Sequence, residues 1–493
     1  MAGDARDGGG TTGRKFAFDV LGRAAFQALS ASKGLVLLPF IARSYGATGY
    51  GIWSQISITA ALFGPLASLR LNEAVVRYLS GIDPGPRRGR VFFSCAIVTW
   101  VLSAVLLLAG GLWVRGLSVG MFGDPTLGRY VLLLLGVLAS SVSFSLTMAY
   151  YRAISRITTS TVLSTIEMFA TLAALIVVTG LLHGALEHAL LVMIAIDLVL
   201  SVACLLDILR RDGGFGFSGS WVMKLLRYSL PLVPTAALYW VVDSSDRFVI
   251  VHFLGLDQAG VYSAAYRVTQ IIKILVQPLS FVLLPVMASL WEQRRESEAL
   301  GYLSKSLHAY ILVAIPAVAG LTAIGSPLMV LLAGASEFEV STSLVALLAV
   351  GELFAGIYQL WVYVLYVKER TPILIAFFAA SAALNLVGNL FLVPRLGILG
   401  AAWATFLAYG LQTALVVSYA RRLVAVPFPV SVTMRTCAAG ALVYLSVAFL
   451  PGTGWTGIAL RGAVGVGSYA VSILLLRLVR LRDLFRFVRR LQQ

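Results

Sequence analysis

Two long apolar segments each carry a stripe of polar and charged side chains. On a helix that turns about 100° per residue, the members of each stripe fall within an arc of roughly 120°. A charge at mid-membrane costs roughly 2.5 to 3.5 kcal/mol on insertion scales, so each one needs a partner or a substrate. Cations facing a cavity suit an anionic group. The first stripe is Asp19, Arg23, Gln27, Ser30 and Lys33, and the second is Arg267, Gln270, Lys273 and Gln277.

Six residues are candidates for contact with a substrate. They share a polar or cationic side chain within an apolar segment, and they are Arg23, Lys33, Arg247, Arg267, Gln270 and Lys273. Arg23 has Asp19 one turn away and Arg247 has Asp243, so both could be neutralised within their own helix. Whether these two arginines are scaffold or touch substrate stays open.

Lys33, Arg267 and Lys273 have no carboxylate three or four residues away. This spacing favours a role in binding, and the alternative is an ion pair with an acid on another helix.

Three acids lie near the middle of apolar segments, at Glu167, Asp197 and Glu352. Carboxylates at such depth can take part in ion or proton coupling, which makes these three candidates for that role. The alternative is an ordinary ion pair with Arg23, Lys33 or Lys273.

The composition defines the class of protein that must position these residues. The chain has 493 residues, 59% of them hydrophobic and only 12% charged. Its mean hydropathy is +0.90. Soluble domains are roughly half apolar and a quarter charged, so we expect a membrane protein that crosses the bilayer many times. No phosphate-binding loop or nucleophile elbow is present, which argues against ATP hydrolysis or acyl transfer.

The apolar runs are long enough to cross about 30 Å of hydrocarbon. They predict fourteen spans, which fall near residues 18–41, 51–69, 91–114, 130–151, 158–182, 189–209, 228–251, 260–284, 303–325, 342–367, 372–393, 397–420, 428–450 and 456–478.

Basic residues set the orientation of these spans, because Lys and Arg are retained on the cytoplasmic side. Of the 38 such residues, 27 fall in alternate loops and in the tails on one side, against 4 on the other. We therefore expect both termini in the cytoplasm. The net charge of +16 is then largely a topology signal, and no nucleic-acid partner is expected.

An internal repeat joins the two halves of the chain. Residues 43–53 read RSYGATGYGIW and residues 252–262 read HFLGLDQAGVY, so that Gly46 corresponds to Gly255 and Gly51 to Gly260. An offset of six spans preserves orientation, which predicts two parallel lobes.

One stretch near the carboxyl end combines two asparagines one turn apart, a proline predicted to end the helix, and a run of small residues. It reads NLVGNLFLVPRLGILGAAWATFLA over residues 385–408. Small residues at this spacing let two helices approach closely in a membrane. The stretch resembles the hairpin of the eleventh and twelfth helices of polysaccharide flippases in the multidrug/oligosaccharidyl-lipid/polysaccharide exporter superfamily. The two glycine motifs of the repeat resemble early segments of its two lobes.

The resemblance implies an all-α protein of two six-helix lobes and two further helices. It implies a substrate that is a polyprenyl-pyrophosphate-linked oligosaccharide, moved to the outer leaflet of a bacterial inner membrane by alternating access through a cationic cavity. Membrane lipids and other polysaccharide-assembly proteins would be partners. No cofactor or metal is expected, and a proton gradient, a sodium gradient or the membrane potential could supply energy. The divisions would be a tail at 1–15, lobes at 16–212 and 213–422, helices at 423–480 and a basic amphipathic tail at 481–493.

Two alternatives stay open. A drug or small-molecule antiporter of the same superfamily, coupled to a cation, should present acids rather than cations to its cavity. A membrane glycosyltransferase or polymerase needs catalytic side chains in a sizeable outer loop, and the predicted outer loops are short. His183, Glu187 and His188 cluster in one such loop but lack a further convergent ligand.

Overall fold

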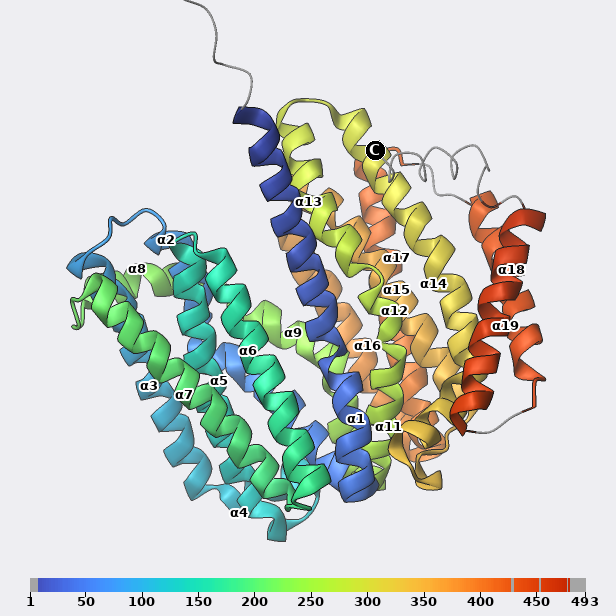
Figure 1. The fold of residues 1–493 in the computed structure, drawn as a ribbon, viewed down its shortest axis with the longest axis horizontal. Coiled ribbons are helices and arrows are strands. Elements are labelled where there is room, and N and C mark those ends of the chain that lie inside the picture. Colours follow the sequence, from blue (N-terminus) through green and yellow to red (C-terminus); the bar gives the residue numbers. More distant parts are fainter. Residues whose placement is uncertain (1–7, 427–429, 452–453, 477, 479–493) are drawn as a thin grey trace, which may run out of the picture. The chain divides into compact units, whose positions relative to one another are not determined.

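The computed structural model describes residues 8–426, 430–451, 454–476 and 478, with side chains from residue 34 onward. Every regular element in these ranges is helical (Figure 1). Ten of the described helices are long and apolar enough to cross a membrane, or up to thirteen if each of three bent pairs forms one span. The all-α, multi-pass class expected from the sequence is confirmed. The count of fourteen and the cytoplasmic termini stay predictions, because most of the first expected span precedes residue 34.

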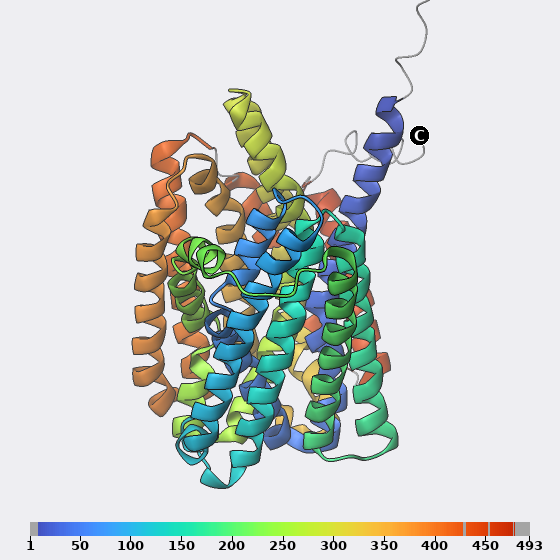
Figure 2. The same ribbon diagram turned by 90° about the vertical axis from the view of Figure 1, so that its left-hand side faces the viewer.

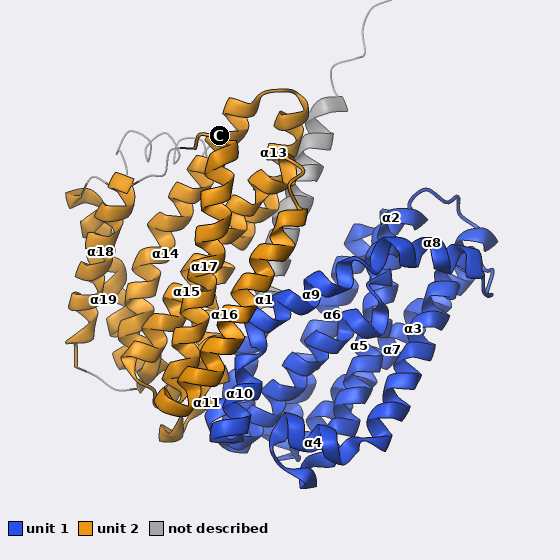
Figure 3. Ribbon diagram, turned by 180° about the vertical axis from the view of Figure 1, so that it is seen from behind, with its two compact units in different colours: residues 1–260 blue, residues 261–493 orange. Residues whose placement is uncertain are grey.

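The chain packs as two compact units, residues 1–260 and 261–493, which Figure 3 shows in different colours. The lobe boundaries expected from the order of the spans stay a prediction.

In the residues that the structure describes, the first unit comprises ten α-helices and the start of an eleventh. They are α1 (Gly8–Ser68), α2 (Leu71–Leu79), α3 (Pro86–Leu112), α4 (Val114–Phe122), α5 (Gly128–Ala153), α6 (Ile157–Ile176), α7 (Leu186–Asp212), α8 (Gly219–Ser229), α9 (Leu232–Ser244), α10 (Asp246–Leu254) and α11 (Leu256–Thr269). Helix α5 lies at the centre and packs against α1, α2, α3 and α7. Figures 1 and 2 show α3, α5 and α7 side by side.

Glycine rather than a loop joins the first two expected spans. The sequence placed spans near residues 18–41 and 51–69 with a connection between them, and the structure reduces this connection to a kink inside α1. Only Gly46 departs from helical geometry, with φ of 64° and ψ of −169°. Since glycine reaches positive φ without a steric penalty, one residue suffices to kink the helix. Gly255 has a φ of 89° and separates α10 from α11 at the corresponding place of the repeat.

A buried carboxylate joins the ends of α3, α5 and α7. Asp212 accepts two hydrogen bonds from the Arg88 guanidinium, at 2.6 and 2.7 Å, and one from the Tyr150 hydroxyl at 2.7 Å. The backbone N–H of Gly85 adds a contact at 3.3 Å. The Asp212 side chain is 0% exposed and the Arg88 side chain 11%. This ion pair fixes the loop before α3 to the end of α7.

We expect Asp212→Ala to be strongly destabilising, because it leaves the Arg88 guanidinium buried without its counter-ion. Breaking such a pair costs about 3 to 5 kcal/mol. Thermal unfolding of the detergent-solubilised protein measures this loss. Asp83→Ala, at an exposed position of the same connection, should change stability by no more than about 0.5 kcal/mol. Equal unfolding temperatures for the two variants would contradict the structural role of Asp212.

The second unit holds the rest of α11 and eight further helices. These are α12 (Ile271–Ile274), α13 (Gln277–Glu292), α14 (Glu296–Ala333), α15 (Thr342–Val367), α16 (Pro372–Leu396), α17 (Ile398–Leu423), α18 (Val430–Ala448) and α19 (Gly454–Leu475). Helix α15 packs between α14 and α17, and α18 lies against α14 and α19. Helices α12 and α13 belong to a bent pair at 41°, with Pro278 in the first turn of α13.

Small residues hold α16 and α17 together, as the sequence predicted. A Cβ on Gly400 would lie 2.3 Å from the carbonyl oxygen of Leu392, and one on Gly388 would lie 3.1 Å from the Cβ of Ala404. The predicted stop at Pro394 was wrong by two residues. Pro394 lies inside α16, which ends at Leu396, and Gly397 turns the chain with a φ of 62°. Proline near the carboxyl end of α16 removes one backbone hydrogen bond without ending the helix, and glycine then supplies the reversal.

Candidate functional site

The second polar stripe predicted from the sequence lies on α11 and α12 of the second unit, and its last member, Gln277, is the first residue of α13. Arg267, Gln270 and Lys273 are all half-buried. The Arg267 guanidinium donates to the side-chain oxygen of Gln270 at 3.1 Å. Gln270 lies at the junction of the two helices, and Lys273 is within the single turn of α12. The chain therefore brings two cations and an amide together over two turns.

Lys273 lies near a buried acid and a buried tyrosine. Helix α12 packs against α14 and α15, which carry Tyr310 and Glu352. Glu352 is 0% and Tyr310 is 1% exposed. The Tyr310 hydroxyl donates to the backbone oxygens of Glu352, at 3.4 Å, and Leu353, at 3.5 Å. Both Lys273 and Glu352 are within electrostatic reach of this hydroxyl. The structure thus groups one predicted binding residue with one predicted coupling residue.

Glycine at position 356 makes room for this cluster. A Cβ there would lie 2.0 Å from the Tyr310 hydroxyl oxygen, so any larger residue would displace the tyrosine from α15. Sequence reasoning identified Lys273 and Glu352 but missed Tyr310 and Gly356. Both residues belong to apolar runs in which tyrosine and glycine are common, so only the fold shows that they meet.

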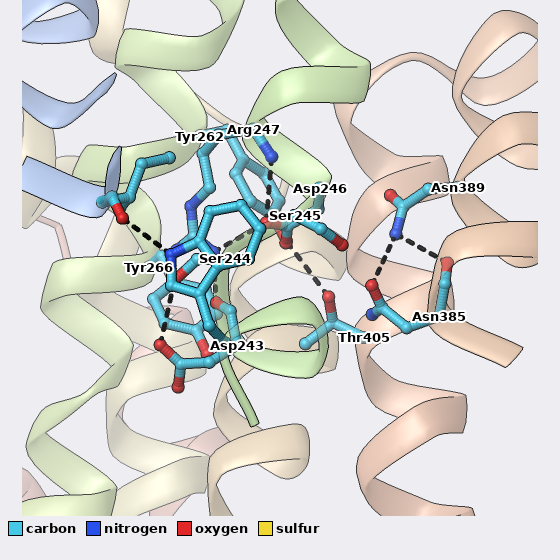
Figure 4. A network of polar contacts seen from close by, with 12 residues as sticks. Asp243, Ser244, Ser245, Asp246, Arg247, Tyr262, Tyr266, Asn385, Asn389 and Thr405 are labelled. Carbon is cyan, nitrogen blue, oxygen red and sulfur yellow. Dashed lines mark hydrogen bonds and ion pairs between the residues drawn. The ribbon is translucent and has the colours of Figure 1, made fainter. Parts of the chain in front are cut away.

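Arg247 is held by neighbouring residues at the junction of α9 and α10 (Figure 4). Its guanidinium forms an ion pair with Asp246 at 2.7 Å and donates to the backbone oxygen of Asp243 at 2.5 Å. The side chain of Arg247 is 5% exposed. Of the two roles that the sequence left open, this geometry favours scaffold, and it adds Asp246 as a counter-ion.

The other predicted site residues are placed as follows. Glu167, on α6, accepts a hydrogen bond from the Thr171 hydroxyl at 3.1 Å, and Asp197 lies half-buried on α7. The structure does not describe the side chains of Arg23 and Lys33, so their roles stay predictions.

Helices α11, α16 and α17 also carry polar side chains that form hydrogen bonds (Figure 4). Asn385 and Asn389 are both 0% exposed, and the Asn389 amide donates to Asn385 at 2.8 Å (backbone oxygen) and 3.1 Å (side-chain oxygen). The hydroxyls of Tyr262 and Thr405 lie 3.4 Å apart. These hydrogen bonds link polar groups inside the apolar second unit.

The cluster of His183, Glu187 and His188 does not form a metal centre. Glu187 pairs with Arg129 at 2.9 Å, and the His188 Nδ1 accepts the backbone N–H of Ala185 at 3.1 Å. In the part of the chain that the structure describes, no group of three or more histidine, cysteine or acidic residues could hold a metal ion.

The fold and these groups define a polytopic helical membrane protein with charged and polar side chains among its helices. A family model described as polysaccharide biosynthesis protein matches residues 40–341, and a second, described as lipid II flippase MurJ, matches residues 258–475. The chain belongs to the polysaccharide biosynthesis protein family, which confirms the resemblance seen in the sequence.

Individual relatives agree with this assignment. The chain is 23% identical over 416 residues to the probable low-salt glycan biosynthesis flippase Agl15 of Haloferax volcanii, covering 84% of each chain. Among solved structures, the lipid II flippase MurJ in an inward closed conformation matches with a TM-score of 0.73 and 15% identity, covering 94% of this chain and 99% of that one. An inward-facing multidrug resistance MATE family transporter matches with a TM-score of 0.59 and 14% identity, covering 81% and 94%. At such identities the two structures establish the fold alone.

Proposed function

We propose that this protein is a flippase that moves a polyprenyl-pyrophosphate-linked oligosaccharide from the cytoplasmic to the outer leaflet of the cytoplasmic membrane. The family supports a role in polysaccharide biosynthesis. The matched relative is named as a glycan biosynthesis flippase and the matched structure as a lipid II flippase, which supports a lipid-linked glycan as cargo.

The observation that carries the proposal is the cationic stretch on α11 and α12. A diphosphate in the membrane interior needs donors that keep their charge, and guanidinium and ammonium groups meet this need. Among the side chains that the structure describes, the Arg267 guanidinium bonds to the Gln270 side-chain oxygen at 3.1 Å and to no carboxylate, so its positive charge is available for an anion. An antiporter for cationic drugs needs acids in this place, so the stretch favours the flippase.

Energy coupling is part of the proposal. Glu352 is a buried acid on α15, which packs against α12, and it is proposed either to exchange a proton or to pair with Lys273. Glu167 and Asp197 stay candidates on α6 and α7 of the first unit.

We expect Arg267→Gln to lower the flipping rate. One hydrogen bond to a charged group contributes about 1.5 to 3 kcal/mol, which corresponds to roughly a tenfold to hundredfold loss. The measurement uses vesicles that contain the purified protein and a fluorescent polyprenyl-pyrophosphate glycan, with a quencher added outside.

The matched control is Arg395→Gln, which removes the same charge from an exposed residue whose guanidinium donates to the Phe391 carbonyl. Its rate should equal that of the wild type. Transport of an organic cation by the wild type, without movement of the glycan, would overturn the proposed function.

A further inference from the structure

A pocket with a basic rim lies between α2 and α8 in the first unit. It has a volume of about 610 Å³ and is lined by Tyr78, Ser220, Met223, Lys224, Arg227 and Tyr228. These residues belong to segments that the charge pattern predicts to lie at the cytoplasmic side. None of them is among the residues proposed above to bind the transported substrate.

Helix α8 is amphipathic, with one face buried and the opposite face exposed. Val222, Leu225 and Ser229 are buried in the core of the unit, with α2 and α3 as neighbours. Met223, Lys224 and Arg227 are exposed on the opposite face. A short helix that presents cations beside exposed apolar side chains is suited to the headgroup region of a bilayer.

Aromatic rings hold the cations in place around the pocket. The Lys224 ammonium lies 4.7 Å from the ring centre of Trp221 and 5.2 Å from that of Tyr78. The Arg77 guanidinium lies 4.6 Å from the ring centre of Tyr228. Cation–π contacts orient a positive group without neutralising it, so its charge stays available for an anion.

The pocket contains no carboxylate of its own. In the part of the chain that the structure describes, neither Lys224 nor Arg227 lies within ion-pair distance of an acid, whereas Arg88 and Arg211 nearby are both paired. Two unneutralised cations beside an exposed methionine match the two ends of an anionic lipid headgroup, its phosphate and its glycerol and acyl carbons.

We propose that this pocket binds the phosphate headgroup of an anionic phospholipid of the cytoplasmic leaflet. Lys224 and Arg227 contact the phosphate, Arg77 contributes from the rim, and Met223 packs against the carbons next to the headgroup. The negative surface potential of this leaflet concentrates such lipids at the site.

Native mass spectrometry of the full, detergent-solubilised chain tests this assignment with phosphatidylglycerol and phosphatidylcholine as probes. We expect the wild type to retain phosphatidylglycerol in preference to phosphatidylcholine. In the double variant Lys224→Gln/Arg227→Gln, affinity for phosphatidylglycerol should fall about tenfold or more, since each basic residue near a membrane surface is worth about 1 kcal/mol.

Two further variants separate a site from a general charge effect. Arg294→Gln/Arg370→Gln removes two exposed cations from other loops of the same predicted side and should leave affinity unchanged. Lys224→Arg/Arg227→Lys keeps both charges and should retain binding. Equal losses in the two glutamine variants would overturn the proposal.

A competition experiment distinguishes a lipid phosphate from a soluble phosphate as the ligand of the pocket. Displacement of phosphatidylglycerol by an equal concentration of inorganic phosphate would overturn the lipid assignment in favour of a soluble anion. If the double variant lost polyprenyl phosphate but kept phosphatidylglycerol, the pocket would belong to the transported lipid. These binding results do not depend on the flipping assay, so the proposed function and this site can fail separately.

Discussion

Alanine in place of Gly260 is expected to destabilise the protein, although the same change inside most helices is stabilising. The added Cβ would lie 2.0 Å from the backbone oxygen of Ala47, and one on Gly51 would lie 2.3 Å from the backbone oxygen of Leu256. A backbone atom cannot move aside as a flexible side chain can. Overpacking of this kind costs about 1 to 3 kcal/mol or more, whereas glycine to alanine in a free helix position gains roughly 0.5 to 1 kcal/mol.

Thermal unfolding of Gly51→Ala and Gly260→Ala in detergent measures the effect, and Gly64→Ala is the matched control. Gly64 belongs to α1, like Gly51, and a Cβ there meets nothing within 4 Å. The control should be neutral or slightly stabilised, and the other two should unfold at lower temperature. An unchanged unfolding temperature in Gly260→Ala would contradict the close approach of the backbones.

The sequence predicted that these glycines correspond in the repeat, but not that they lie in contact. The repeat offset of 209 residues aligned Gly46 with Gly255 and Gly51 with Gly260, but an offset gives no contacts. The structure adds that the aligned segments touch each other reciprocally, and the Thr48 hydroxyl donates to Asp257 at 2.7 Å across the same contact. Two repeated segments can lie in contact or far apart. Here they are in contact, because glycine lets the two backbones approach closely.

Hydropathy predicted the spans well where they are straight. Residues 342–367 coincide with α15, because a long apolar run in hydrocarbon must satisfy its backbone as a helix. The bends between consecutive helices were harder to predict from the sequence. Proline marked the bend before α13, but the positive φ of Leu69 and Arg70, which bends α1 against α2, has no signal in residue type.

For the candidate site too, the sequence predicted local spacing but not long-range contacts. Arg267, Gln270 and Lys273 share a face at helical spacing, and spacing alone found them. Which acid approaches Lys273 depends on how α12 packs against α14 and α15, and the sequence offered Glu167, Asp197 and Glu352 as equals. Long-range partners of buried charges follow from tertiary packing, which no periodicity encodes.

A double-mutant cycle between Lys273 and Glu352 is expected to show strong coupling. Lys273→Met should destabilise more than Glu352→Gln, because it leaves a fully buried carboxylate, whereas the half-buried Lys273 can still reach water. If the two charges form a buried pair, removing one partner costs up to about 3 to 5 kcal/mol. The double variant carries neither charge, so it should lose less than the sum of the single losses, by roughly 1 to 3 kcal/mol.

The cycle also decides what Glu352 does in transport. If Glu352 serves to neutralise Lys273, flipping lost in Glu352→Gln should partly return in the double variant, and its pH dependence should match the wild type. If Glu352 exchanges a proton during transport, Glu352→Gln should abolish the pH dependence of the flipping rate, and Lys273→Met should not restore it.

The matched control is a second cycle between two exposed residues of the same unit, Lys305→Met and Glu369→Gln. Their losses of stability should be additive within about 0.5 kcal/mol. Additivity of the same size for Lys273 and Glu352 would mean that the two charges act independently, and Lys273 would then be left as a substrate contact.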